Sequence, residues 1–533
     1  MAGQYFDPLT VECPFCKTKA AYPLKELENY QSVCFQCKKS LAQVSRQMEQ
    51  TKQKHSAELS NFWLKVELFD DYILDESLTD EEFDNLQTLG ELIDLLKRFD
   101  PTASIESLSH HSRFSAAIKT FYSQPADSIR LDDLAILQTQ TKKLPFNQFA
   151  LVGARIFTGE EFLENHSVII NNDNIESIIP DNQLTAEALK IYLNGGILAP
   201  GFIDLQVNGG GGKFFTHDNS LSAIKTLLEA HRSKGTTSLL PTLISEKAVT
   251  HQQAANSVLT AVAAGYKSVL GLHIEGPFFA KTKRGAHAEK FIRKMESTDI
   301  DWLKNLTRNQ ELTILLTLAP EILQPGVIRE LSQQGLLVFA GHTDATYEQI
   351  QIAIEEGLCG FTHLYNAMRN TTARDPGVVG AALENKTTWC GIIIDGHHVH
   401  SASARIAYAA KPEKVFLVSD AMATVGSTEK SFQLYDEKIN ESQTKPTACL
   451  INQEGKLAGS AIGLIDAVKL NTQWVGVDLA ESLRMASLYP ARCLKLDHQL
   501  GKIQSGYRAD LVHFTDDFQV TSTWVAGDWM LHK

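Results

Sequence analysis

Eight short apolar segments, each followed by a longer stretch of helical character, dominate the chain between residues 197 and 418. The segments are 197–205, 237–243, 269–274, 312–318, 336–339, 360–362, 389–394 and 415–418. Near-continuous apolar runs are typical of strands that are buried on both faces of a parallel sheet. Between consecutive segments the chain is long enough for a crossover helix. Eight such units predict an α/β fold, a closed TIM (β/α)8 barrel.

Strand-like sequence also flanks this region on both sides. Residues 149–157 and 167–174 precede it, and residues 509–514 and 520–531 follow it, with polar turns between the runs. We expect the two flanks to assemble into one small β-sandwich domain, formed by residues 149–198 and 495–533. Residues 199–494 are then left for the barrel.

Two pairs of cysteines near the N-terminus have the spacing of a metal site. Cys13 and Cys16 form one C-x2-C pair, and Cys34 and Cys37 form a second pair after 17 intervening residues. Four thiolates that fill all coordination positions of the ion are typical of a structural Zn²⁺. A segment this short also has too little hydrophobic core to fold without a bound metal. We expect residues 1–40 to form a zinc-ribbon-like module; redox-active or incidental cysteines are the alternative.

A helical extension is predicted over residues 41–145. Residues 79–82 (TDEE) have the form of a capping box, and apolar residues continue at helical spacing until Asp100-Pro101. The apolar face must pack on its neighbours, on the barrel or on a second subunit. Because residues 58–84 are acidic and lysines are few near the cysteines, a protein partner or a purely structural role is favoured over nucleic acid.

The composition excludes several other classes of protein. A formal net charge of −13 argues against a general nucleic-acid-binding surface. No apolar run approaches the roughly 18 residues of a membrane span, and the start MAGQYFDPLT lacks an export signal. The other four cysteines are scattered rather than arranged as a disulfide framework. We expect a cytoplasmic protein that does not associate with membranes.

Residue types used in metal-dependent hydrolysis follow the predicted strands. Glu275, His342 and His363 each stand at the end of one strand, and in a barrel these ends share the face where chemistry is done. A Glu/His/His set holds a catalytic ion and leaves one position for water. We therefore expect one divalent catalytic ion here, zinc or another divalent metal. Two satisfied structural histidines are the alternative.

Two further strand-end residues suit proton transfer and carbonyl orientation. Asp420 follows the last strand, where a carboxylate beside the attacking water could take its proton and return it to the leaving group. His398 could polarise or orient a substrate carbonyl. An Asp after a strand is more often a helix N-cap, but six strand ends with catalytic residue types argue for a site.

Residues 149–533 resemble the N-acetylglucosamine-6-phosphate deacetylases of the amidohydrolase superfamily. The motifs that carry the resemblance appear in family order: PGFIDLQVNG (200–209), HIEGPFF (273–279), KRGAH (283–287), GHTDATY (341–347), THLYNAM (362–368), DPGVVGA (375–381), IDGHHV (394–399), VSDAM (418–422), LAGSA (457–461) and MASLYPA (485–491). They span the whole domain, so the match is specific. The first 145 residues have no counterpart in this pattern.

The resemblance implies hydrolysis of N-acetyl-D-glucosamine 6-phosphate to glucosamine 6-phosphate and acetate. It implies an amidohydrolase TIM barrel, a small β-sandwich domain and a homodimer. Its metal ligands map to Glu275, His342 and His363, and its acid/base maps to Asp420. Its substrate contacts map to Ala286, His287, Asn366, Ala367, Arg374, His398, Leu457, Ala458 and Gly459. Arg374 would clamp the sugar phosphate in the neighbouring subunit's site.

The sequence departs from related binuclear enzymes at the first strand. Many amidohydrolases carry His-x-His there and bind two ions, whereas this chain has Gln206 and Asn208. Neutral amides are poor ligands for a transition metal, so we expect a single catalytic ion. His397 precedes His398 where an aliphatic residue is usual, which leaves open which imidazole faces the substrate.

Two other functions compete with this interpretation. The substrate could be N-acetylgalactosamine 6-phosphate, because the motifs cannot distinguish one hydroxyl epimer. Alternatively, the protein could be a regulator in which the zinc-ribbon and helical module binds a partner and the barrel senses an amino-sugar phosphate. The intact set of Glu275, His342, His363 and Asp420 favours an enzyme.

Overall fold

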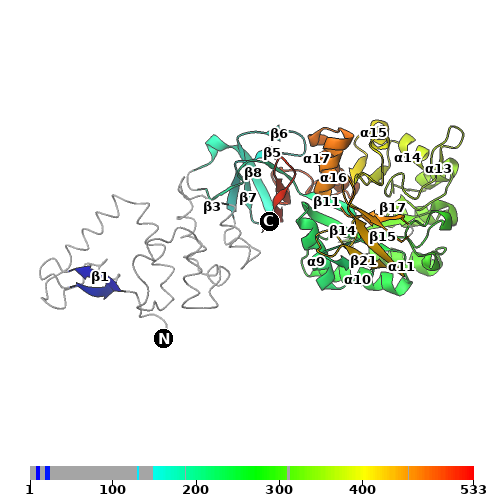
Figure 1. Cartoon of the computed structure of the whole chain (residues 1–533), viewed down its shortest axis with the longest axis horizontal. Coiled ribbons are helices and arrows are strands. Elements are labelled where there is room, and N and C mark those ends of the chain that lie inside the picture. The colour runs from blue at the N-terminus through cyan, green and yellow to red at the C-terminus, as the bar shows by residue number, and fades with distance from the viewer. Residues whose placement is uncertain are drawn as a thin grey trace. The chain divides into compact units, whose positions relative to one another are not determined.

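The computed structural model describes residues 8–12, 19–23, 129–130, 148–185, 188–308, 312–453 and 455–532 (Figure 1). Cys13, Cys16, Cys34 and Cys37 lie outside the described residues, as does nearly all of 41–145, so the zinc module and the helical extension stay predictions. The chain divides into two compact units, residues 1–152 with 179–193 and residues 153–178 with 194–533. This division differs from the predicted domain boundaries, which also stay a prediction.

Five short strands account for most of the described part of the first unit. β1 (Pro8–Glu12) and β2 (Lys19–Pro23) pair antiparallel, with Glu12 opposite Lys19. β9 (Lys190–Tyr192) pairs parallel with both β3 (Ile129–Arg130) and β4 (Gln148–Val152). β3 is thus a strand inside the segment for which the sequence predicts helix.

An eight-stranded parallel barrel forms the centre of the second unit. Its strands follow one another in chain order: β11 (Phe202–Val207), β14 (Thr236–Ile244), β15 (Gly271–Glu275), β16 (Thr313–Leu318), β17 (Leu337–Ala340), β18 (Gly360–Phe361), β19 (Trp389–Ile392) and β20 (Val415–Leu417). Apart from three partly buried strand-start residues, their side chains are buried, as expected when helices cover the outside and side chains fill the inside. The predicted TIM barrel is confirmed.

The barrel closes through the segment that follows its last strand. Val207 of β11 forms a parallel bridge with Ala421. The backbone N–H of Asp420 donates to Gln206 O at 3.0 Å, and that of Asn208 donates to Ala421 O at 2.9 Å. The first and last strands of the barrel therefore meet at Asp420.

Helices surround the strands (Figure 1). The helices between strands are α9 (Leu221–Arg232), α10 (Ala248–Ala263), α11 (Ser297–Thr307), α12 (Val327–Gln333), α13 (Tyr347–Glu355), α14 (Gly377–Glu384) and α15 (Ser401–Ala410). After the last strand come α16 (Leu464–Leu470), the π-helical turn η5 (Asn471–Val475), α17 (Leu479–Ala486) and α18 (Leu488–Cys493). The Ser220 and Thr346 side chains cap α9 and α13 by accepting N–H groups of the first turn.

A six-stranded sheet joins the two flanks of the barrel. Its order is β27 (Asp528–Leu531), β26 (Val520–Val525), β25 (Leu511–Phe514), β10 (Ile197–Pro200), β5 (Arg155–Phe157) and β6 (Phe162–Leu163). Strands from before and after the barrel therefore pair in one sheet, as the sequence predicts. β7 (His166–Asn171) and β8 (Asn174–Pro180) follow β6 along the chain.

The predicted first barrel strand, 197–205, was wrong in its extent. Ile197–Pro200 is β10 of the six-stranded sheet, and the barrel strand begins only at Phe202. Gly201 stands at the crossing between the two sheets, where an added Cβ would lie 2.2 Å from Thr237 Oγ1. Both strands are fully apolar at this point, so the sequence pattern could not separate them.

A four-stranded antiparallel sheet follows the barrel, which sequence analysis missed. It comprises β21 (Ser431–Leu434), β22 (Glu437–Ser442), β23 (Cys449–Ile451) and β24 (Leu457–Ser460), paired in chain order. Ser460 at its end bridges to Ala421, beside Asp420. A small hairpin of β12 (Gly209–Gly210) and β13 (Lys213–Phe214) lies at the end of β11.

The close packing of the barrel strands can be tested at Gly271. An added Cβ there would lie 2.0 Å from the Thr313 carbonyl oxygen of the paired strand, a backbone atom that cannot move aside. We expect Gly271→Ala to destabilise the protein by about 3 kcal/mol through overpacking, measured as a lower midpoint of thermal unfolding. Gly391→Ala in β19, whose nearest neighbours are side-chain atoms at 3.3 Å, is the control and should cost less. Equal midpoints would contradict this packing.

Candidate active site

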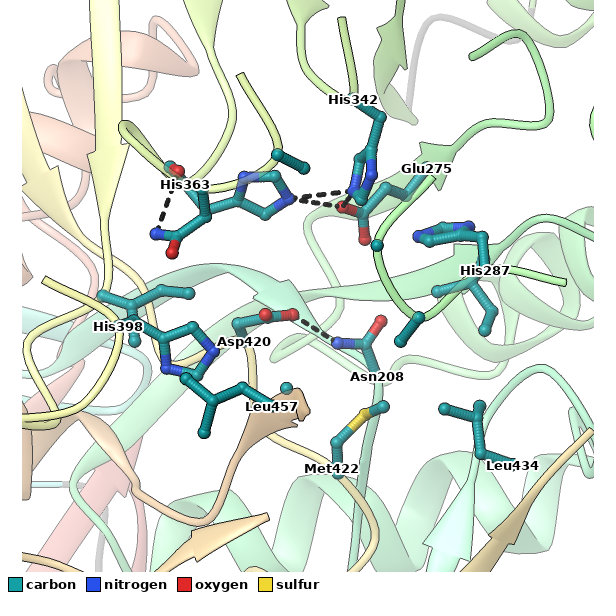
Figure 2. A pocket seen from close by; sticks show the side chains of 17 residues that line it. Asn208, Glu275, His287, His342, His363, His398, Asp420, Met422, Leu434 and Leu457 are labelled. Atoms are coloured by element: carbon teal, nitrogen blue, oxygen red, sulfur yellow. Dashed lines mark hydrogen bonds and ion pairs between the residues drawn. The ribbon is translucent and has the colours of Figure 1, made fainter. Parts of the chain in front are cut away.

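Three potential metal ligands converge at the carboxyl ends of adjacent strands. Glu275 is the last residue of β15, and His342 and His363 each follow their strand, β17 or β18, by two residues. Glu275 Oε1 lies 3.2 Å from His342 Nε2 and 3.1 Å from His363 Nε2, and the two nitrogens are 3.1 Å apart. Figure 2 shows the three side chains pointing at one another. The structure therefore brings together the three residues that the sequence predicts as ligands.

The hydrogen atoms on the two imidazoles cannot satisfy all the close contacts among Glu275, His342 and His363. His342 Nδ1 lies 2.9 Å from the Lys283 carbonyl oxygen, which only accepts, so Nδ1 carries the hydrogen. In a neutral imidazole, Nε2 of His342 is then a bare lone pair that faces Glu275 Oε1 and His363 Nε2. A single hydrogen on His363 Nε2 can satisfy one of these contacts. A cation among the three atoms would satisfy all of them.

The donor set also fits the chemistry of a divalent metal. One carboxylate and two imidazoles, all nearly completely buried, form the catalytic type of ligand set that leaves an open position. Among the described residues, no other group of three or more His, Cys, Asp or Glu side chains has metal-ligand spacing. The site can hold a divalent ion.

Three of the key residues adopt a left-handed backbone conformation. The φ angle is +49° at His342, +34° at His363 and +51° at Asp420. Non-glycine residues pay roughly 1–3 kcal/mol for such a conformation, and it persists where the surroundings fix it, commonly at functional sites. The same turn recurs at three strand ends that contribute polar groups to one pocket.

Asp420 lies opposite the three ligands and is held by two amides. Asn208 Nδ2 donates to Asp420 Oδ1 at 2.6 Å, and Gln206 Nε2 donates to the same oxygen at 3.1 Å. Gln206 Nε2 also lies 3.1 Å from Glu275 Oε1. Burial and, next, the charge of Glu275 raise the pKa of Asp420 above its usual range. A carboxyl group with a raised pKa is suited to accept and return a proton near neutral pH.

His398 reaches the same pocket, and His397 does not. His398 Nδ1 lies 2.7 Å from Asp395 Oδ2, so the hydrogen sits on Nδ1 and Nε2 is left for the pocket. Burial alone would lower the pKa of His398, but the hydrogen bond and charge of Asp395 raise it above its ordinary value. His397 Nε2 instead lies 2.9 Å from the Thr447 carbonyl oxygen. The structure thus favours His398 as the imidazole that faces a ligand.

Most of the predicted site residues line one pocket. The predicted residues in its wall are Glu275, Ala286, His287, His342, Asn366, Ala367, His363, His398, Asp420, Leu457 and Gly459. Ala458 is absent from this wall and lines a neighbouring pocket, which shares Gly285, Ala286, Leu434 and Leu457 with the first.

Arg374 lies outside both of these pockets. It is exposed in the loop before α14, which is tied by contacts between Thr372 and Asp375 and by the ion pair of Arg369 with Asp375. No Lys or Arg lines the catalytic pocket among the described residues, whereas Arg284 and Lys456 line the neighbouring pocket.

Sequence reasoning missed several residues of the pocket. It treated Gln206 and Asn208 only as absent ligands, although both hold Asp420. It assigned no role to Asp395, which orients His398. Ile244, Ile393, Met422 and Leu434 complete the apolar wall. The strand-end position of Asp395 was a usable signal; Leu434 belongs to a sheet that was not predicted.

Comparisons with known proteins agree with this geometry. Residues 197–530 match the model of the amidohydrolase family, and residues 148–198 match that of the NagA composite domain. The chain is 38% identical over 392 residues to the N-acetylgalactosamine-6-phosphate deacetylase of Shewanella sp. (strain ANA-3), covering 72% of this chain and 97% of that protein. It is 34% identical over 385 residues to the N-acetylglucosamine-6-phosphate deacetylase of Haemophilus influenzae, covering 72% and 99%.

A solved structure extends the likeness to three dimensions. The crystal structure of N-acetylglucosamine-6-phosphate deacetylase from Pasteurella multocida superposes with a TM-score of 0.69 at 35% identity, covering 72% of this chain and all of that one (100%). In the part of the chain that the structure describes, no helix is both long and apolar enough to cross a bilayer.

The barrel and its strand-end ligands define a hydrolase that works with a divalent metal ion. The chain belongs to the amidohydrolase family, in the branch that contains these deacetylases.

Metal binding at the three ligands can be tested directly. We expect Glu275→Ala to contain one divalent ion per chain fewer than the unchanged protein by elemental analysis, because a third of the donor set is lost. An ion at 1,000 times its Kd stabilises a folded protein by about 4 kcal/mol, so metal added to stripped protein should raise Tm by more when Glu275 is present than when it is replaced. Glu355→Ala, at an exposed position on α13, is the control. Equal ion content in both variants would exclude this site.

Proposed function

We propose that the chain hydrolyses the N-acetyl group of N-acetyl-D-glucosamine 6-phosphate, which yields glucosamine 6-phosphate and acetate. The observation that carries the proposal is the pairing of Glu275, His342 and His363 with Asp420 across one pocket. The deacetylases among the relatives supply the substrate class. N-Acetylgalactosamine 6-phosphate is a second candidate, because the 38% identical Shewanella relative is named for it.

Asp420 is the proton carrier in this proposal. A divalent ion, zinc in our proposal, would when bound lower the pKa of a water molecule and polarise the acetyl carbonyl. As the water oxygen bonds to the carbonyl carbon, Asp420 takes a proton from it. When the C–N bond breaks, Asp420 gives this proton to the departing amine nitrogen. Gln206 and Asn208 keep the carboxylate oriented by donating to its Oδ1.

His398 orients the substrate from the side of the pocket where Asp420 lies, across from Glu275 and His342 (Figure 2). Its Nδ1–H is committed to Asp395, so Nε2 is the atom that meets a substrate oxygen. Because Asp395 raises the pKa of His398, a protonated ring can also donate to an anionic or carbonyl oxygen. Ala286, His287, Asn366, Ala367, Leu457, Ala458 and Gly459 complete the proposed substrate contacts.

The phosphate group is proposed to be bound by Arg374 of a second subunit in a homodimer. The pocket wall has no lysine or arginine among the described residues, and the chain's formal charge is −13, so an anionic substrate needs a cation from elsewhere. Arg374 is exposed on a loop fixed by local contacts, and its guanidinium group can bind a phosphate through two hydrogen bonds.

The remaining predictions concern the whole chain. We propose one structural Zn²⁺ at Cys13, Cys16, Cys34 and Cys37, a protein partner for the N-terminal extension, and action in the cytoplasm. The spacing of the cysteines and the acidic composition of the extension support these proposals.

An acetate-release assay tests the function. The purified protein is given the 6-phosphates of N-acetylglucosamine and N-acetylgalactosamine, and the unphosphorylated sugars as controls. We expect acetate from the phosphorylated sugars, with the higher kcat/KM for the glucosamine compound. A higher value for galactosamine would select the second candidate, and no acetate from either would overturn both.

The role of Asp420 predicts a sharp loss of turnover. Asp420→Asn keeps the size of the side chain but cannot accept the water proton, so we expect kcat to fall by about 10²–10⁴-fold, the range for general acid–base catalysis. Ion content should stay unchanged, because Asp420 is not one of the three ligands. Near-normal acetate release from this variant would contradict the mechanism.

The phosphate proposal predicts a binding defect. Arg374→Ala should raise KM for the phosphorylated sugar by about tenfold or more, because a charge-assisted contact worth about 1.5–3 kcal/mol is lost, with kcat changed little. Arg284→Ala is the matched variant, since Arg284 lines the neighbouring pocket of this chain. If only the Arg284 variant shows the higher KM, the phosphate is held within one chain.

A further inference from the structure

The carboxamide oxygen of Asn208 is a buried acceptor without a partner. Asn208 is 2% exposed, and its Nδ2 is committed to Asp420 Oδ1 at 2.6 Å. Its Oδ1 has no hydrogen-bond partner among the described residues. Buried acceptors are almost always satisfied, so an unpartnered one that lines a pocket points to a bound water or ligand.

The direction of this oxygen points to the reaction centre. Asn208 belongs to the wall of the catalytic pocket, beside Asp420. Figure 2 shows its oxygen turned away from Asp420 and toward the side of the pocket where Glu275 lies. The nitrogen that fixes this orientation is bonded to the same carbon as the oxygen, so Asp420 and Asn208 Oδ1 lie within reach of one small molecule.

The ionised carboxylate of Asp420 fixes the orientation of the amide. Asp420 must be ionised to accept a proton from the water. If the amide were then flipped, its oxygen would face Asp420 Oδ1 at 2.6 Å, with no hydrogen between two acceptors. Gln206 Nε2 donates to the same Asp420 oxygen, as expected for an acceptor. The carboxylate therefore determines which way Asn208 Oδ1 points.

We propose that Asn208 Oδ1 accepts one hydrogen of the water molecule that attacks the substrate. The inference rests on the proposed function. Asp420 accepts the other hydrogen of the same water, so both O–H bonds are held by the protein. The lone pairs of the water then face away from these two acceptors, toward the carbonyl carbon. Asn208 is thus a positioning residue that aims the nucleophile.

A water molecule fits this position better than part of the substrate. The Oδ1 atom is nearly inaccessible, so its partner must be small, and a buried water needs two or more polar partners. Asn208 Oδ1 and the Asp420 carboxylate provide two acceptors for its two hydrogens. A substrate N–H or O–H would make the same contact only by entering this narrow space.

The test combines a structure of the metal-loaded protein with kinetics of Asn208→Leu. A high-resolution crystal structure should show a water within about 3 Å of both Asn208 Oδ1 and an Asp420 oxygen. Asn208→Leu removes the Oδ1 acceptor together with the Nδ2 donor to Asp420. We therefore expect kcat to fall by at least about 10–100-fold, the effect of a lost hydrogen bond to a charged centre, with KM changed less than about threefold and ion content unchanged. The crystallographic water is the readout that isolates Oδ1. Asn256→Leu, at an exposed position of α10, controls for the substitution itself.

The outcomes separate the possible failures. An Asn208 oxygen bonded to a protein group, or no water at this position, overturns the inference even if Asn208→Leu does not fold. A rise in KM without a fall in kcat means that Oδ1 binds the substrate, which also overturns it. Absence of acetate release by the unchanged protein overturns the proposed function instead, and the crystallographic water remains a separate result.

Discussion

The active site is organised around three atoms with lone pairs, and the protons on their side chains are too few to satisfy the contacts between them. Glu275 Oε1, His342 Nε2 and His363 Nε2 lie 3.1–3.2 Å apart, and the Lys283 carbonyl fixes the tautomer of His342 so that its bare nitrogen faces the other two. A cation is the simplest partner for such a cluster. The barrel brings the donors together from three neighbouring strands, and the left-handed turns at His342 and His363 direct the two histidine side chains inward. Such backbone strain persists where the surrounding structure fixes it, commonly at functional sites.

A second constraint comes from the closure of the barrel. The first strand supplies Gln206 and Asn208, and the segment after the last strand supplies Asp420, so these residues can meet only where the barrel closes. Their amides stand where related binuclear enzymes place histidine ligands. Here they donate hydrogen bonds to Asp420, and Gln206 also donates to Glu275, in place of binding a second ion. The same two residues that favour a single ion thus orient Asp420, the proposed proton carrier.

Much of the site could be predicted from the sequence because all strands of a parallel barrel end on the same face. Residues that follow the apolar strands must therefore meet there, which brings Glu275, His342, His363 and Asp420 together on sequence grounds alone. The orientation of individual side chains could not be predicted in this way. That Asp395 selects His398 over His397, or that Asn208 holds Asp420, depends on distances of 2.6–2.9 Å across the fold. The division of 197–205 at Gly201 was hidden because both strands are buried, and the roles of Arg374 and the N-terminal cysteines stay predictions.

The most direct test of the account is the position of the metal in a crystal of the loaded protein, located by anomalous scattering at the metal edge. The account predicts one ion in the barrel, within about 2.0–2.2 Å of Glu275 Oε1, His342 Nε2 and His363 Nε2, the distances usual for zinc. It predicts no ion bound by Gln206 and Asn208. A second ion between these amides and Asp420, or an ion bound without the two histidines, would contradict it.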